Sequence, residues 1–326
     1  MVAETIVSLM LAAVSLFALV KGASYLVDGA SDIAKWLKVS PMLVGLTVVA
    51  FGTSLPELMV SFFGALSGNN DLSLGNIIGS NIFNIALIIG LSALFTKLVV
   101  GPRTVMYEFP FLLVSSFMLL ILGNDIFIFN KNTFSLGRID GIIFLIMFSF
   151  FLYYIFISMR HDQKEAAKKT EKVQHQNPFW KNSLLIIGGL LALVIGGKLF
   201  VAAAQDIIAA FGVSELFIGV TLAAIGTSLP ELATSFVAAR KNESDIAIGN
   251  IVGSNIFNIL LILGVVSLAK PIPISTITLG IDGMVMIFVT LLFLVFAAKN
   301  GYIHKKEGFF LLAAYLLYFA YVLWRL

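Results

Sequence analysis

The heptapeptide Gly52-Thr53-Ser54-Leu55-Pro56-Glu57-Leu58 returns unchanged as Gly226-Thr227-Ser228-Leu229-Pro230-Glu231-Leu232, and each copy lies inside a strongly apolar run. An acidic side chain at the centre of a membrane helix costs about 2.5–3.5 kcal/mol. A proline there removes an N–H and clashes with the carbonyl four residues earlier. Each copy therefore offers a loosened backbone with free carbonyl oxygens, two hydroxyls and one carboxylate, which are the ligands that a hard cation prefers.

The composition is that of a helical membrane protein. The 326 residues are 59% hydrophobic and 12% charged, and the mean hydropathy is +1.01, far outside the soluble range. Many apolar runs reach the roughly 20 residues that cross a bilayer, and their continuous pattern argues against a β-barrel. The chain has no cysteine, which excludes thiolate metal sites. The net charge of +3 lies mostly in loops and indicates no nucleic-acid partner.

We predict an all-α polytopic protein with about ten transmembrane helices. The start of the chain, Met1–Val20, contains Glu4 and no basic n-region, which favours a retained helix over a cleaved signal. The one long polar segment, 161–181, is predicted to be a charged linker. The predicted spans are 4–31, 40–66, 72–97, 104–123, 138–158, 182–209, 214–239, 245–269, 275–297 and 306–325.

The distribution of lysine and arginine predicts the orientation. With the N-terminus outside, most loop Lys and Arg fall on the cytoplasmic side, and the outer side keeps only Lys131, Arg138, Lys270 and Arg325. This is a strong positive-inside bias. We therefore expect both termini outside, the linker 161–181 in the cytoplasm, and a multi-pass protein of a prokaryotic plasma membrane.

The chain is internally repeated. A shift of 174 positions aligns Gly45–Gly90 with Gly219–Gly264 without a gap, and 27 of the 46 positions are identical. Each repeat holds about five helices, and an odd number places the second repeat upside down in the membrane. We therefore predict two inverted five-helix repeats, 1–160 and 182–326, joined by the linker 161–181. Such repeats place a substrate site near the bilayer midplane, at their interface.

A second duplicated motif adds polar stripes to two apolar helices. Gly75–Asn84 matches Gly249–Asn258, and within each copy a Ser and an Asn four residues apart share one helix face. Combined with the broken helices, these stripes predict a site that is lined only by oxygen ligands, which favours Ca²⁺ or alkali ions over Zn²⁺ or Cu²⁺. The candidate ligands that the residues themselves indicate are Glu57, Glu231, Ser54, Ser228, Ser80, Ser254, Asn84 and Asn258.

Other residues of the second motif have two readings. Small and amide residues in membrane helices often serve close packing and interhelical hydrogen bonds. Packing is the favoured role for the motif glycines. For Asn76, Asn81, Asn250 and Asn255 the sequence supports packing and function equally.

The two duplicated motifs resemble the α-repeats of the sodium/calcium exchanger family, within the cation/Ca²⁺ antiporters, and most closely a prokaryotic-type member. The resemblance implies four central cation positions at which Na⁺ and Ca²⁺ compete, and first and sixth helices that slide across a fixed core. It also implies a role for Asn84 and Asn258 in the central layer, and it adds backbone carbonyls to the ligand set. These carbonyls belong to Ala50, Thr53, Ala224 and Thr227.

The resemblance also bears on ion selectivity. Potassium-dependent members, and some prokaryotic ones, carry Asp at the place of Asn258, whereas this chain has Asn at both 84 and 258. This difference implies a K⁺-independent exchanger.

We therefore predict a secondary active antiporter that exchanges Na⁺ for Ca²⁺ by alternating access. Two carboxylates in a region of low dielectric are stable only when their charge is neutralised, by one Ca²⁺ or by several Na⁺. The alternatives are a Ca²⁺/H⁺ antiporter on the same scaffold and a cation channel. An intramembrane enzyme would need an activated nucleophile or a His-containing metal site, and the sequence indicates neither. We expect no cofactor beyond the transported ions, and a monomer whose partners are inorganic cations and lipid.

Overall fold

The computed structural model is almost entirely helical and describes residues 2–68, 70–124, 134–168, 177–210 and 225–325. Within these residues, eight helices are long and apolar enough to cross a membrane, and the bent pair Pro41–Thr53 and Leu55–Leu66 would be a ninth, broken span. The predicted polytopic helical fold is therefore confirmed. Of the predicted helix 214–239, the part up to residue 224 lies outside the described residues.

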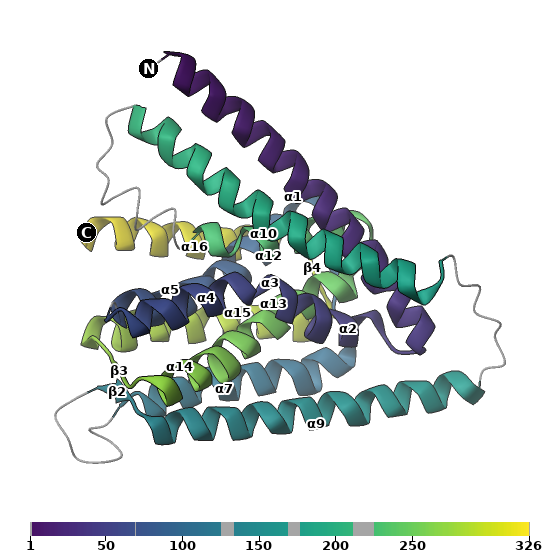
Figure 1. Cartoon of the computed structure of the whole chain (residues 1–326). Helices are drawn as coiled ribbons and strands as arrows, with labels where there is room; N and C mark the ends of the chain where they lie inside the picture. Colours follow the sequence, from purple (N-terminus) through teal and green to yellow (C-terminus); the bar gives the residue numbers. More distant parts are fainter. Residues whose placement is uncertain (1, 69, 125–133, 169–176, 211–224, 326) are drawn as a thin grey trace.

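Two long helices form a pair that crosses the rest of the molecule. α1 (Val2–Leu37) and α10 (Phe179–Ala210) lie side by side and run obliquely to the other helices (Figure 1). Their backbones are in contact at glycines, because a Cβ on Gly22 would lie 2.9 Å from the Gly189 carbonyl oxygen, and a Cβ on Gly189 would lie 2.7 Å from that of Gly22. Small residues permit this close approach between membrane helices.

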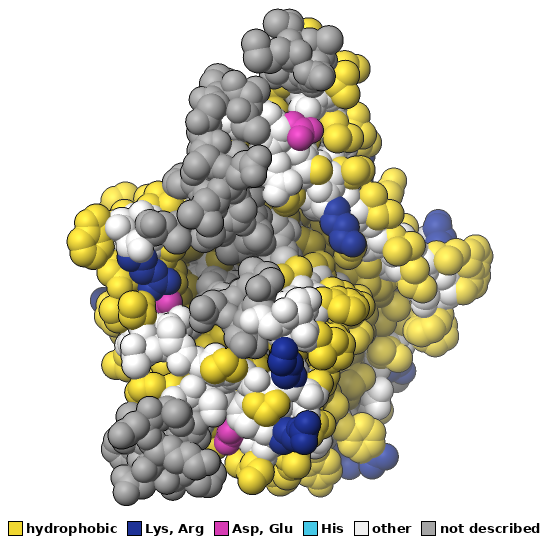
Figure 2. Space-filling view, turned by 60° about the vertical axis from the view of Figure 1, so that its left-hand side comes forward, with side chains coloured by type: hydrophobic (Ala, Val, Ile, Leu, Met, Phe, Trp, Pro, Cys, Tyr) yellow, Lys and Arg dark blue, Asp and Glu magenta, His cyan; other side chains and the backbone are white. Residues whose placement is uncertain are grey.

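The surface of the described residues is largely apolar. Large side chains such as Met106, Phe150 and Leu317 are 64–74% exposed, and hydrophobic side chains dominate much of the face in Figure 2. Exposed apolar area on this scale is typical of a surface that contacts lipid. The helices that surround the motif helices include η3 (Thr104–Glu108), α7 (Phe109–Leu122), α9 (Arg138–Lys168), η5 (Thr278–Asp282), α15 (Gly283–Asn300) and α16 (Lys305–Arg325).

The first heptapeptide breaks its helix where the sequence predicts. α2 (Pro41–Val44), the π-helical η1 (Gly45–Val49) and α3 (Ala50–Thr53) end at Ser54, and α4 (Leu55–Leu66) continues after a bend of 45°. The second copy has the same break at Ser228, before α12 (Leu229–Arg240). The two serines share a non-helical backbone, with φ −82° and ψ 2° at Ser54 and φ −89° and ψ 5° at Ser228.

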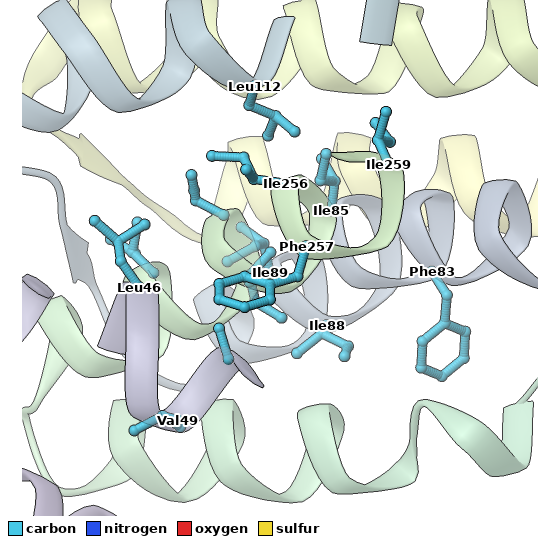
Figure 3. Close-up of a cluster of buried hydrophobic side chains, with 14 of the residues drawn as sticks. Leu46, Val49, Phe83, Ile85, Ile88, Ile89, Leu112, Ile256, Phe257 and Ile259 are labelled. Atoms are coloured by element: carbon cyan, nitrogen blue, oxygen red, sulfur yellow. The ribbon is translucent and has the colours of Figure 1, made fainter. Parts of the chain in front are cut away.

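The helices of the second motif form the centre of the molecule. They are α5 (Asn70–Ile82), η2 (Phe83–Ile89) and α6 (Gly90–Phe95), and α13 (Ser244–Ile256), η4 (Phe257–Ile262) and α14 (Leu263–Ala269). The apolar residues of these helices pack there, and Ile85, Ile89 and Phe257 belong to the buried cluster of Figure 3. Because the apolar sides hold these helices together, their polar stripes are fixed against one another.

Two short antiparallel strand pairs join distant parts of the chain. β1 (Leu98–Val99) pairs with β4 (Tyr302–Ile303), and β2 (Ser135–Leu136) pairs with β3 (Ile272–Pro273). The sequence analysis did not predict them, because two residues are too few to show an alternating pattern.

α9 is ten residues longer than predicted, since it continues from 158 to Lys168. The added residues are Met, Arg, His, Asp, Gln, Lys, Glu and Ala, most of which favour a helix even where no apolar face is present. Residues 161–168 of the predicted linker are therefore helical.

The start of α1 and the end of α16 lie at the same side of the molecule, opposite the side where α9 ends and α10 begins (Figure 1). This arrangement agrees with a predicted topology in which both termini face one side and the linker faces the other. Which side faces the cytoplasm stays a prediction.

Candidate cation site

Glu57 and Glu231 lie in the first turns of α4 and α12, directly after the two helix breaks, and neither carboxylate is exposed. Pro56 and Pro230 precede them within the first two helical positions, where a missing N–H breaks no helical hydrogen bond. A helix N-terminus also stabilises a nearby negative charge. The local sequence thus starts a new helix and places a carboxylate at its favourable end.

Serines from both repeats contact each carboxylate. Ser228 Oγ lies 3.1 Å from Glu57 Oε1, and the pseudo-symmetric Ser54 Oγ lies 3.2 Å from Glu231 Oε1. Within each repeat, Ser80 Oγ is 3.5 Å from Glu57 Oε1, and Ser254 Oγ is 3.4 Å from Glu231 Oε1. The structure therefore brings both glutamates and all four predicted serines into one buried cluster.

Four buried oxygens of the predicted ligands have no hydrogen-bond donor among the described residues. They are Glu57 Oε2, Glu231 Oε2, Asn84 Oδ1 and Asn258 Oδ1. Leaving a buried polar atom unpaired costs about 1–3 kcal/mol, and more for a charged one. All four atoms are hydrogen-bond acceptors. A cation with oxygen ligands, such as Ca²⁺ or Na⁺, satisfies this set.

The cluster has no protein counter-charge in the part of the chain that the structure describes. The ion pairs between described residues involve neither Glu57 nor Glu231. No group of three or more His, Cys, Asp or Glu side chains that could hold a metal ion occurs among the described residues. The site therefore has two carboxylates and neutral oxygens, a combination that suits one divalent cation or a few monovalent ones.

Of the four residues whose backbone carbonyls the resemblance adds to the ligand set, the structure describes Ala50, Thr53 and Thr227. The Ala50 carbonyl lies beside the cluster, 3.5 Å from Ser254 Oγ, and also accepts Ser54 N–H at 3.0 Å. The Thr53 and Thr227 hydroxyls donate to Asn250 Oδ1 at 3.0 Å and to Asn76 Oδ1 at 3.2 Å. Ala224 lies outside the described residues.

Two further serines, which were not among the predicted ligands, support this site. Ser61 Oγ accepts from Asn76 Nδ2 at 3.2 Å, and Ser235 Oγ accepts from Asn250 Nδ2 at 2.9 Å. Both serines are buried. The signal was present, because each serine follows its glutamate by four residues and both copies keep it. These contacts give Asn76 and Asn250 a supporting role, since they join each threonine to a serine and donate to neither carboxylate.

Comparisons with known proteins agree with this architecture. The family described as "Sodium/calcium exchanger protein" matches residues 7–157 and 181–324. The putative antiporter CaxA of Alkalimonas amylolytica is 40% identical over 311 residues, which cover 94% of this chain and 95% of CaxA. The sodium/calcium exchanger MaX1 of Methanosarcina acetivorans is 31% identical, with 91% and 93% covered.

A solved structure has the same fold. The sodium-calcium exchanger NCX_Mj, soaked with zero Na⁺ and Ca²⁺, superposes with a TM-score of 0.81 at 32% identity, over 99% of this chain and 100% of that one. The resemblance that the duplicated motifs indicate is therefore confirmed. Because the family match covers both halves and these relatives align over nearly their whole length, this chain belongs to the sodium/calcium exchanger family.

Proposed function

We propose that the protein exchanges Na⁺ for Ca²⁺ across the membrane by alternating access, independently of K⁺. The observation that carries the proposal is the set of four buried, unpaired oxygens on Glu57, Glu231, Asn84 and Asn258. In this proposal Ca²⁺ binds between the two carboxylates and the two amide oxygens. Na⁺ ions use the same carboxylates together with the serine hydroxyls and the backbone carbonyls of Ala50, Thr53, Ala224 and Thr227.

Competition for the carboxylates couples the two ions. One Ca²⁺ neutralises both glutamates, and so do two or more Na⁺, but both sets cannot bind at full strength. Closing the empty site during the change of access would seal two unpaired carboxylates in a region of low dielectric, which is strongly unfavourable. Only a loaded site therefore changes access readily, and Na⁺ entering down its gradient drives Ca²⁺ out.

The α1–α10 pair is the element that we propose to move. α10 packs on both heptapeptides, since a Cβ on Gly52 would lie 2.5 Å from Leu190 Cδ2, and one on Gly226 would lie 2.5 Å from Val201 Cγ2. Sliding of the pair past these two glycines would open the site to one side while closing it to the other.

K⁺ independence rests on the neutral side chains at 84 and 258. An acidic side chain at either position would add a negative charge, which would favour binding of a further cation.

The proposal also includes a monomer without catalytic chemistry or resident cofactor. It lies in the plasma membrane with both termini outside and segment 161–181 in the cytoplasm.

Ion-gradient flux in proteoliposomes tests the proposal. Purified protein is reconstituted, and uptake of radiolabelled Ca²⁺ is driven by an outward Na⁺, K⁺ or H⁺ gradient, with Glu57→Gln protein as the matched control. We expect uptake with the Na⁺ gradient alone, unchanged when K⁺ is removed. Uptake driven by a pH gradient without Na⁺ would instead identify a Ca²⁺/H⁺ antiporter. Ca²⁺ conductance without counter-transport would identify a channel.

A further inference from the structure

Two buried asparagines, Asn81 and Asn255, pair with each other across the two repeats. Asn81 Nδ2 donates to the Asn255 backbone carbonyl at 3.4 Å, and Asn255 Nδ2 donates to the Asn81 backbone carbonyl at 3.1 Å. A backbone carbonyl only accepts hydrogen bonds. The end of each amide that faces it must therefore be the NH₂ group, and the orientation of both side chains is determined.

The orientation of Asn81 and Asn255 in turn determines that of Asn258 and Asn84. With its NH₂ group engaged, Asn81 presents Oδ1 to the other side, where it accepts from Asn258 Nδ2 at 2.9 Å. Asn255 Oδ1 accepts from Asn84 Nδ2 at the same distance of 2.9 Å. Asn258 and Asn84 thus have their NH₂ groups bound, and each keeps a buried Oδ1 without a donor among the described residues.

We propose that Asn81 and Asn255 are positioning residues that hold the carbonyl oxygens of Asn258 and Asn84 toward the bound cation. This inference rests on the proposed function of the site. A rotated Asn258 amide would set its oxygen against Asn81 Oδ1 and turn its NH₂ group toward the cation, which is unfavourable on both counts. The pairing is crossed, because each positioning residue contacts the ligand of the other repeat. Asn81 orients Asn258 and not Asn84, and Asn255 orients Asn84 and not Asn258.

Double-mutant cycles on Ca²⁺ binding test the crossed pairing. Dissociation constants are measured by equilibrium binding of radiolabelled Ca²⁺ to purified protein in detergent. We expect Asn81→Ala to weaken binding about tenfold in the wild-type background and about tenfold in Asn84→Ala. In Asn258→Ala we expect almost no further effect, because the residue that Asn81 orients is already gone. Asn255→Ala should show the reverse pattern.

The expected pattern separates positioning from a general structural role. A loss that was only structural would be equal in all backgrounds. Equal losses, or coupling of Asn81 to Asn84 in its own repeat, would overturn the inference. Asn81→Leu, which fills a similar volume without polar atoms, gives the same comparison if the alanine variant does not fold.

Failure of the inference is distinct from failure of the proposed function. If wild-type protein binds no Ca²⁺, or binds it equally well after Glu57→Gln, the site itself is wrong and the inference falls with it. Glutamate-dependent binding with additive cycles would overturn the inference alone.

Discussion

At the scale of single residues, each glutamate carboxylate of the site has one oxygen that accepts hydrogen bonds from described residues and one oxygen that does not. Each glutamate uses Oε1 to accept from serines, and Oε2 has no donor among the described residues. The serines hold each carboxylate in place, and the remaining oxygen is the one that we propose binds the cation. Since Ser54 contacts Glu231 and Ser228 contacts Glu57, a displacement of either repeat would disturb both carboxylates.

Removing one of these serine hydroxyls should weaken Ca²⁺ binding without abolishing it. Hydrogen bonds to charged groups are worth about 1.5–3 kcal/mol, so we expect Ser54→Ala and Ser228→Ala each to raise the half-saturating Ca²⁺ concentration by about tenfold or more. The symmetry of the contacts predicts similar effects. Sodium-driven Ca²⁺ uptake at varied Ca²⁺ concentration measures both.

Ser149→Ala is the matched control, because that exposed hydroxyl bonds only the Leu145 carbonyl of its own helix, at 2.9 Å. Normal half-saturation in both heptapeptide variants would show that the serine contacts have no part in ion binding.

The glutamates and serines could be predicted because they are duplicated polar residues in apolar runs. Their partners could not. The sequence shows that Ser54 and Glu231 are both present, but the hydrogen bond between them depends on how two segments 177 residues apart meet. For the same reason Asn81 and Asn255 stayed undecided, since packing and positioning need the same residue type.

At the scale of elements, polar contacts hold the α1–α10 pair to the core. Lys241 Nζ lies 2.6 Å from Asp28 Oδ1, and Ser31 Oγ donates to Glu243 Oε1 at 2.8 Å. Both contacts join α1 to the turn between α12 and α13. In contrast, Ser8 Oγ donates to Asp206 Oδ2 at 3.2 Å, which joins α1 to α10 within the pair. Sliding of the pair would break contacts of the first kind and preserve the second.

Cross-linking distinguishes these two kinds of contact, and the natural chain has no cysteine to interfere. We expect a reducible dithiol cross-linker between Asp28→Cys and Lys241→Cys to stop exchange, because it ties α1 to the core. The same reagent between Ser8→Cys and Asp206→Cys should leave exchange largely intact. Ca²⁺ uptake before cross-linking, after it and after reduction is the measurement. Full activity with Asp28 and Lys241 cross-linked would contradict the sliding pair.

Local sequence predicted the helix positions, but not the π-helical segments. η2 and η4 begin at the equivalent residues Phe83 and Phe257, within runs that read as ordinary apolar helix. Such segments are frequent at functional sites. Local propensity does not distinguish such a segment from an ordinary apolar helix. The end of α9 differs from the prediction for another reason, because the helix continues to Lys168, beyond its apolar region.

At the scale of the whole molecule, the two halves are interlocked rather than adjacent. β1 of the first half pairs with β4 of the second, β2 of the first pairs with β3 of the second, and the site serines cross in the same way. The last helix is fixed by a bidentate ion pair, in which Arg325 donates to Asp282 at 2.8 and 2.9 Å. The Asp282 side chain is only 5% exposed.

Breaking this ion pair should destabilise the protein. Arg325→Ala leaves a nearly buried carboxylate without its partner, which costs more than the ~0–1 kcal/mol of an exposed pair. We expect a clear fall in the melting temperature in detergent. Lys168→Ala, which removes an exposed pair with Glu165, should change it little. Equal melting temperatures for the two variants would show that the pair does not stabilise the fold.

The most direct test of the central claim is the stoichiometry of Ca²⁺ binding to purified wild-type protein and to its glutamate variants. We predict one saturable Ca²⁺ per chain that Na⁺ displaces, at least about 100-fold weaker binding in both Glu57→Gln and Glu231→Gln, and unchanged binding in the exposed control Glu165→Gln. Wild-type affinity in either Glu57→Gln or Glu231→Gln would contradict a shared site between the two carboxylates.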